Sequence, residues 1–229
     1  MKLKIFAAAL ALTFSVNSNV AQAVPIVTLH SSNTGIGTMT FSVSGTLIII
    51  NESWTGSGPG VLQISGMDAG VDYTVEKRIT NSTGTDWSRF ANELLDPDNG
   101  VGSNDDLDPK PYASFIPAGF TTSNDFDGLS FAQGSGIPRT SLAFSTVFSD
   151  ELTDARDFID FSTGSVLGTG GTDTISFGLR DNAAANQPFL LFQRPNESSR
   201  EVPEPISLAL FGVGLAGLGW SRRKNLEAV

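Results

Sequence analysis

The sequence of 229 residues contains no cysteine and only one histidine, His30. The lack of cysteine excludes disulfide bonds, thiol nucleophiles and thiolate metal sites. With one histidine, a zinc site built from several imidazoles is excluded, and a Ser-His-Asp triad would have to use His30. His30 lies on a predicted strand, where a surface or edge position is the simpler interpretation.

Basic residues are also scarce in the central part of the chain. Residues 24–200 contain 9 Lys or Arg and 21 Asp or Glu, which gives a net charge of −12. A basic footprint for nucleic acid is missing, and this charge repels DNA and anionic lipid surfaces. We therefore expect no nucleic-acid partner. An acidic surface favours solubility and divalent cations.

The N-terminus has the composition of a secretory signal peptide. Lys2 and Lys4 precede an apolar stretch at 5–16, and Ala21 and Ala23 provide small residues at a cleavage site. The sequence predicts a signal peptide over residues 1–23 and export by the Sec machinery.

The C-terminus combines a rigid motif, an apolar run and a basic stop. Pro203 and Pro205 hold the motif extended, and Glu204 between them gives a processing enzyme a charge to recognise. The run at 206–220 would be roughly 22 Å long as a helix, against about 30 Å of bilayer hydrocarbon. Such a short span suits a temporary anchor. Three basic residues then mark the cytoplasmic side: Arg222, Arg223 and Lys224.

This order of features resembles the PEP-CTERM sorting domain of Gram-negative bacteria. The matching motif consists of Val202, Pro203, Glu204 and Pro205. The resemblance implies recognition by an exosortase, removal of the tail, and delivery to the cell surface or an exopolysaccharide matrix. An ordinary C-terminal membrane anchor is the alternative.

Between the two ends, the pattern is that of an all-β protein. Apolar and polar residues alternate at 39–43, 71–75 and 175–179, which predicts strands with one buried face. Further strands are predicted at 26–30, 46–50, 61–65, 141–148 and 189–193, and one short helix is predicted at 87–95. The prediction is an antiparallel β-sandwich, jelly-roll or Ig-like, over residues 24–193. A polar linker at 194–201 and the tail at 202–229, with one membrane helix, would complete the chain.

Two internal segments support the sandwich by resemblance. Residues 72–95 and 176–195 are similar to segments of exported PEP-CTERM β-sandwich proteins of unassigned function. The resemblance implies no activity for this chain.

An Asp- and Asn-rich segment after residue 95 is the candidate metal site. Calcium takes six to eight oxygen ligands, which such loops can supply. The segment departs from the EF-hand pattern, because its glycine comes one position early and the distal glutamate is missing. A second acidic turn at 124–128 would complete the site or stand alone, and the alternative is that all these are ordinary turn residues. The candidate ligands are Asp96, Asp98, Asn99, Asp105, Asp106 and Asp108.

A glycine pattern at 212–217 matches the dinucleotide-binding fingerprint. That fingerprint requires a preceding strand and a following helix in a βαβ unit, whereas this one lies inside the apolar run of the tail. We therefore expect no required cofactor, with calcium as the one optional ion.

Of three functions considered, we predict the first, a non-enzymatic, structural or adhesive surface protein. The second is a calcium-dependent carbohydrate-binding module, which needs exposed aromatic residues such as Trp54, Trp87 or Tyr112; we interpret Trp87 as core, and Trp54 as either exposed or at the core edge. The third is a polysaccharide hydrolase with two carboxylates, although no acidic residue stands on an apolar background that would raise its pKa.

Overall fold

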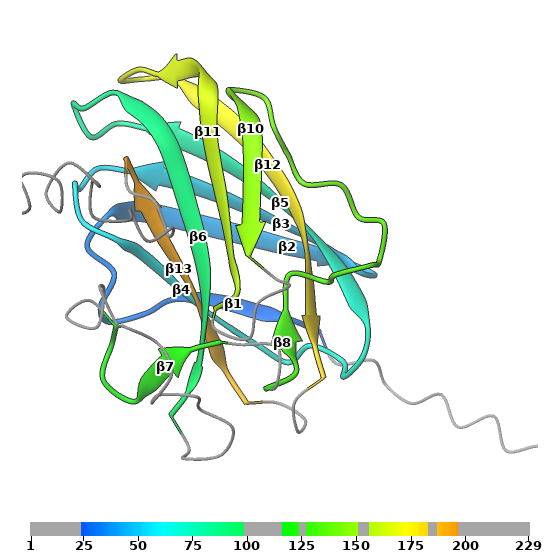
Figure 1. The fold of residues 1–229 in the computed structure, drawn as a ribbon. Coiled ribbons are helices and arrows are strands. Elements are labelled where there is room, and N and C mark those ends of the chain that lie inside the picture. Colours follow the sequence, from blue (N-terminus) through cyan, green and yellow to red (C-terminus); the bar gives the residue numbers. More distant parts are fainter. Residues whose placement is uncertain (1–23, 99–115, 124–126, 151–155, 183–186, 197–229) are drawn as a thin grey trace, which may run out of the picture.

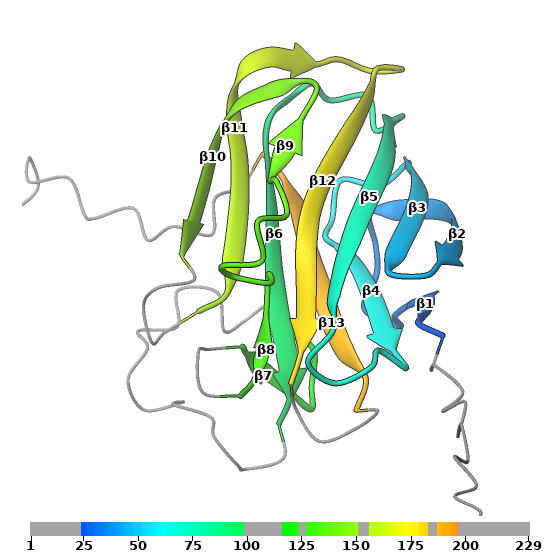
Figure 2. The same ribbon diagram turned by 90° about the vertical axis from the view of Figure 1, so that its right-hand side faces the viewer.

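The computed structural model describes residues 24–98, 116–123, 127–150, 156–182 and 187–196. Within these ranges the chain forms thirteen β-strands and no helix. Accordingly, nothing in the described residues is a helix suited to crossing a membrane. The strands form two sheets, which confirms the all-β prediction and is consistent with a β-sandwich (Figures 1 and 2).

The first sheet has seven strands, with neighbours in the order β1-β4-β13-β6-β11-β10 and with β7 paired to β6. All its pairings are antiparallel. The strands are β1 (Ile26–Leu29), β4 (Gly60–Ser65), β6 (Trp87–Pro97), β7 (Phe120–Thr122), β10 (Phe144–Asp150), β11 (Phe158–Leu167) and β13 (Phe189–Pro195). Strand β13 thus continues through Arg194 and Pro195, which the sequence assigns to a linker.

The second sheet has six strands, in the order β2-β3-β5-β12-β8 and with β9 paired to β12. Its strands are β2 (Ile36–Ser44), β3 (Leu47–Trp54), β5 (Asp72–Asn81), β8 (Leu129–Ser130), β9 (Thr140–Ser141) and β12 (Thr172–Asp181). Figure 1 shows β6, β11 and β10 crossing in front of β12, β5, β3 and β2. The short strands β7 and β8 lie toward the same end of the molecule in both views.

One pairing differs from the predicted antiparallel arrangement. Strands β3 and β5 run parallel, with Ile50 opposite Lys77. The chain leaves β3, forms β4 in the other sheet and returns as β5. Parallel neighbours need such a crossover connection, because a tight hairpin can join only antiparallel strands.

The predicted helix at 87–95 is wrong, because these residues form the interior strand β6 between β13 and β11. Trp87, Phe90 and Leu94 pack into the core between the sheets. Leu95 packs instead into a second apolar cluster with Val61, Leu190 and Phe192. In a strand buried on both faces, apolar and polar residues no longer alternate, and the spacing of the apolar residues can match that of a helix.

The main core lies between the two sheets and draws its side chains from both. In β3 and β5 every second residue is buried, as the alternation predicts. The largest apolar side chains of this core are aromatic, and their edge-to-face and tilted contacts add to the hydrophobic stabilisation. The fully buried aromatic side chains include Trp54, Trp87, Tyr73, Phe90, Phe131, Phe161 and Phe177.

Candidate functional site

The sorting and processing residues predicted from sequence lie outside the described residues. They are Ala21 and Ala23 at the signal cleavage site, Val202, Pro203, Glu204 and Pro205 in the motif, and Arg222, Arg223 and Lys224 in the basic stop. Their roles rest on the sequence and on the family comparison given below.

Of the six predicted calcium ligands, only Asp96 and Asp98 lie within the described residues. Asp96 lies near the end of β6, and Asp98 follows that strand with its backbone N–H donating to the Gly119 carbonyl at 2.9 Å. Asn99, Asp105, Asp106 and Asp108 fall outside the described residues. Among those described, no three acidic or histidine side chains gather closely enough to hold a metal ion. Calcium binding stays a prediction.

Asp96 nevertheless has an unusual environment. Burial, followed by the charges of Asp127 and Asp181, raises its pKa to about 7. Burial disfavours the ionised carboxylate, and like charges nearby act in the same direction. The expectation that no carboxylate has a raised pKa is therefore wrong at Asp96. The sequence does not show that Asp96, Asp127 and Asp181 lie near one another, because they come from separate segments of the chain.

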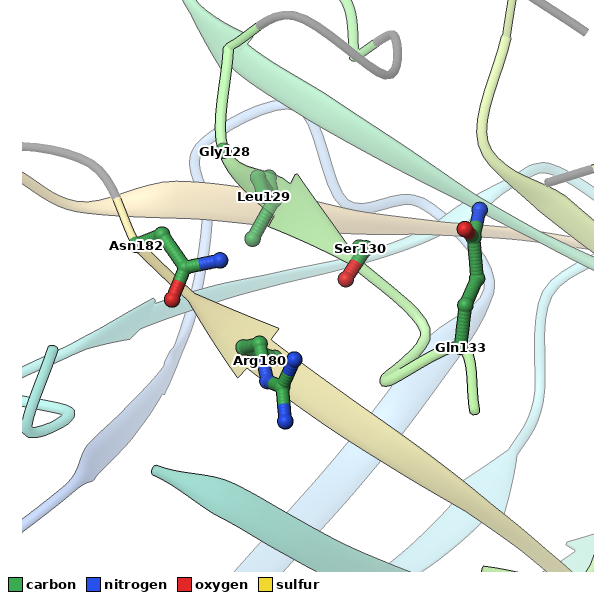
Figure 3. Close-up of a pocket in the computed structure, with 6 residues that line it drawn as sticks. All are labelled: Gly128, Leu129, Ser130, Gln133, Arg180 and Asn182. Carbon is green, nitrogen blue, oxygen red and sulfur yellow. The ribbon is translucent and has the colours of Figure 1, made fainter. Parts of the chain in front are cut away.

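A polar pocket of about 320 Å³ opens beside β8 at this end of the sandwich (Figure 3). Arg180 of β12 lies on one side, but its guanidinium makes a bidentate ion pair with Asp72, at 2.6 and 2.7 Å. This pairing neutralises the charge that an anionic ligand would need. The pocket is lined by Gly128, Leu129, Ser130, Gln133, Arg180 and Asn182.

The aromatic residues suggested for sugar stacking are not on the surface. Trp54 is 0% exposed and Trp87 is 1% exposed, so the surface position considered for Trp54 is wrong and the core position of Trp87 is confirmed. Their rings meet edge-to-face with centroids 5.3 Å apart, and Trp54 meets Phe90 in the same way at 5.5 Å. Tyr112 lies outside the described residues.

His30 follows β1 and is partly buried. Its Nδ1 accepts a hydrogen bond from the backbone N–H of Ser32 at 3.2 Å, and its ring packs edge-to-face on Phe120 at 5.6 Å. These contacts fit the edge position expected from the sequence. They give His30 a local structural role.

The most unusual arrangement is a polar cluster inside the core, which we call the Lys77 cluster (Lys77, Glu52, Asn92 and Gln193). Lys77 of β5 projects from the second sheet and is fully buried, and its Nζ donates to Gln193 Oε1. Asn92 Oδ1 lies 3.4 Å from the same nitrogen, and Glu52 Oε2 lies 3.3 Å from it. The ammonium also faces the Phe90 ring, 4.7 Å from its centroid.

Both sheets contribute to this cluster. Asn92 and Gln193 stand opposite each other on β6 and β13 of the first sheet. Glu52, on β3 of the second sheet, accepts from Gln193 Nε2 at 3.1 Å and from the indole Nε1 of Trp54 at 3.0 Å. Burial lowers the pKa of Lys77, against the opposing effects of Glu52 and then Asp173.

The sequence does contain a signal for this cluster. Lys77 occupies an inward position between Val75 and Ile79, and Glu52 occupies one between Ile50 and Trp54. A charged residue at an inward position of an alternating strand is expensive unless it is paired. Sequence reasoning stopped each apolar pattern before the charge and missed both residues.

A second buried charge group lies around Glu93 of β6. Arg156 Nε donates to Glu93 Oε1 at 2.8 Å, and Arg194 donates to Glu93 Oε2 at 2.8 Å. All three residues are at most 5% exposed. This group joins β6 and β13 to the segment that precedes β11, and its geometry is that of a structural ion-pair network.

Comparison with known proteins identifies the tail. The family model of the PEP-CTERM protein-sorting motif matches residues 201–224. No curated protein and no solved structure matches the chain. The motif implies an exported protein that an exosortase processes. By its C-terminal motif, the chain is a PEP-CTERM domain-containing protein.

Proposed function

We propose that this protein is a non-enzymatic, structural or adhesive β-sandwich, held at the cell surface or in an exopolysaccharide matrix after an exosortase removes its tail. The main support for this proposal is the sorting motif at 201–224. A signal peptide over 1–23 and a temporary membrane anchor at 206–220 complete the proposed route. The polysaccharide is the proposed partner outside the cell.

The described domain supports a structural role. Large aromatic side chains fill the space between the sheets, and the buried Lys77 and Glu93 each have an ionic partner. The pocket beside β8 holds an arginine that Asp72 already neutralises. Burial of Trp54 and Trp87 removes two of three candidates for a sugar-stacking surface, which weakens the carbohydrate-binding alternative.

The sorting step is tested by mass spectrometry of both termini of the protein recovered from its host, from cells and from medium. We expect an N-terminus at Val24 and a C-terminus near Val202–Pro205. In a variant with Pro203, Glu204 and Pro205 replaced by alanine, the tail should stay attached. Glu197→Ala removes a nearby charge outside the motif and serves as the matched control. Normal tail removal in the triple variant would overturn the assignment.

The final location and role are tested on the host polysaccharide. The processed protein should sediment with the purified polymer and release no reducing sugar from it. Release of sugar that disappears in one Asp or Glu variant would favour the hydrolase instead. Retention that a calcium chelator abolishes would favour the carbohydrate-binding module.

A further inference from the structure

The Lys77 cluster brings an amine, a carboxamide and a carboxyl group together in a dry, apolar site. Lys77, Gln193 and Asn92 are each 0% exposed, and Glu52 is 2% exposed. Trp54 and Phe90 lie against them. Burial lowers the pKa of Lys77, which makes its neutral, nucleophilic form easier to reach. The group adjacent to that nucleophile is the side-chain amide of Gln193.

We propose that Lys77 and Gln193 form an intramolecular isopeptide bond, with Glu52 as the catalytic residue that transfers the proton. The bond would join β5 of one sheet to β13 of the other. It is independent of the proposed function in the matrix. It would make the sandwich a covalently closed domain without any cysteine.

The chemistry balances within the cluster. Glu52 takes a proton from the Lys77 ammonium, which leaves a neutral amine and a carboxylic acid. The Nζ lone pair forms a bond to Gln193 Cδ, and the carbonyl electrons move to Oε1. Glu52 then gives its proton to Nε2 and takes one from Nζ. The Cδ–Nε2 bond breaks, ammonia leaves, the carbonyl re-forms, and Glu52 is again protonated.

The position of Glu52 decides between the two neighbouring amides. Its Oε2 faces the attacking nitrogen at 3.3 Å, and its Oε1 accepts from the leaving nitrogen of Gln193 at 3.1 Å. One carboxyl group therefore bridges both nitrogens, as a proton carrier must. The amide nitrogen of Asn92 makes no hydrogen bond to any described residue, so nothing there would protonate it as it leaves.

The rest of the cluster holds the reacting groups in place. The indole N–H of Trp54 fixes the Glu52 carboxyl group, and Asn92 Oδ1 accepts from Lys77 Nζ. Folding brings Lys77 and Gln193 together across 116 residues of sequence. Holding two reactants in such a geometry replaces a bimolecular encounter and supplies much of the barrier lowering.

The test is peptide mapping of the full-length protein and of the form recovered from the host. A cross-linked Lys77 resists trypsin, so the peptide that ends at Arg78 should be joined to residues 181–200, with the mass of one ammonia missing. Intact mass alone does not decide, because the Asn99-Gly100 step can also lose ammonia by cyclisation. Separate, unmodified peptides would overturn the proposal. A link to residues 90–139 would instead assign the bond to Asn92 and overturn the role of Gln193.

Variants then test the role of Glu52. Glu52→Gln should leave the two peptides unlinked, whereas the matched control Glu76→Gln, which changes a partly exposed carboxylate one residue from Lys77, should keep the link. After heat denaturation the linked chain should also migrate faster in gel electrophoresis than Lys77→Met, because its loop stays closed. If Glu52→Gln still forms the link, Glu52 does not transfer the proton. The wild-type map needs no variant, so a variant that fails to fold leaves the test of the bond intact.

Discussion

The buried carboxylate of Glu93 offers a direct measure of what holds the first sheet together. It is bonded by Arg156 and Arg194, and all three side chains are almost fully excluded from solvent. Glu93→Gln keeps the shape of the side chain but removes its charge. Two buried guanidinium groups then face a neutral amide.

The expected cost follows from desolvation. Removing one partner of a buried ion pair destabilises by about 3–5 kcal/mol, because the remaining charge stays buried. Glu76→Gln is the matched control, since Glu76 pairs with Arg78 at 2.7 Å with side chains 31% and 55% exposed. An exposed pair of this kind contributes about 0–1 kcal/mol.

Urea unfolding followed by tryptophan fluorescence measures both variants. With a slope of about 2 kcal/mol per molar urea, Glu93→Gln should lower the midpoint by roughly 1.5–2.5 M. Glu76→Gln should lower it by about 0.5 M at most. Equal shifts for the two variants would refute the assignment of Glu93 to a stabilising buried network.

Two further predictions test the core and the acidic end. A Cβ on Gly60 would lie 2.3 Å from Cη2 of Trp54, so Gly60→Ala should lower the unfolding free energy by about 1–3 kcal/mol. Gly168→Ala is the control and should change the unfolding free energy little, because its Cβ would meet only ordinary contacts. Similar unfolding curves for the two variants would contradict the tight packing around Trp54. The pKa of Asp96 is about 7 in the folded state and near its ordinary 3.8 in the unfolded state. Its contribution to stability is therefore complete below pH 3.8 and is lost as the pH rises to about 7. Asp96→Asn should flatten the fall in melting temperature between pH 4 and 7, and an unchanged profile would exclude Asp96 as its source.

The sequence located strands best where one face of the sheet is buried. The alternation at 71–75 and 175–179 marks β5 and β12, whose inward residues are Tyr73, Val75, Ile175 and Phe177. It failed at β6, where both faces are covered, and β11 was not predicted at all. The parallel pairing of β3 with β5 depends on the path of the chain between sheets, which periodicity does not encode.

The candidate sites also differ in whether their residues are close together in the sequence. The sorting motif is local in sequence and was recognisable from a few adjacent residues. The Lys77 cluster is formed by four strands from two sheets, and its residues lie up to 141 positions apart. Only the placement of charges at inward positions pointed to it, and this signal needs the strand bounds to be known first.

The proposed bond would also explain why such an expensive cluster is found in the core. As an ion pair, Lys77 and Glu52 carry a desolvation penalty that apolar residues would avoid. Once the amine has become an amide and Glu52 is protonated, none of the four residues of the Lys77 cluster carries a charge. Closing a loop of 116 residues would then restrict the unfolded chain, an effect of about 4.7 kcal/mol for a loop of roughly 100 residues. That is a large fraction of the stability of an ordinary domain, about 5–15 kcal/mol. A chain without cysteine would thereby gain outside the cell the kind of covalent closure that disulfides give other exported proteins.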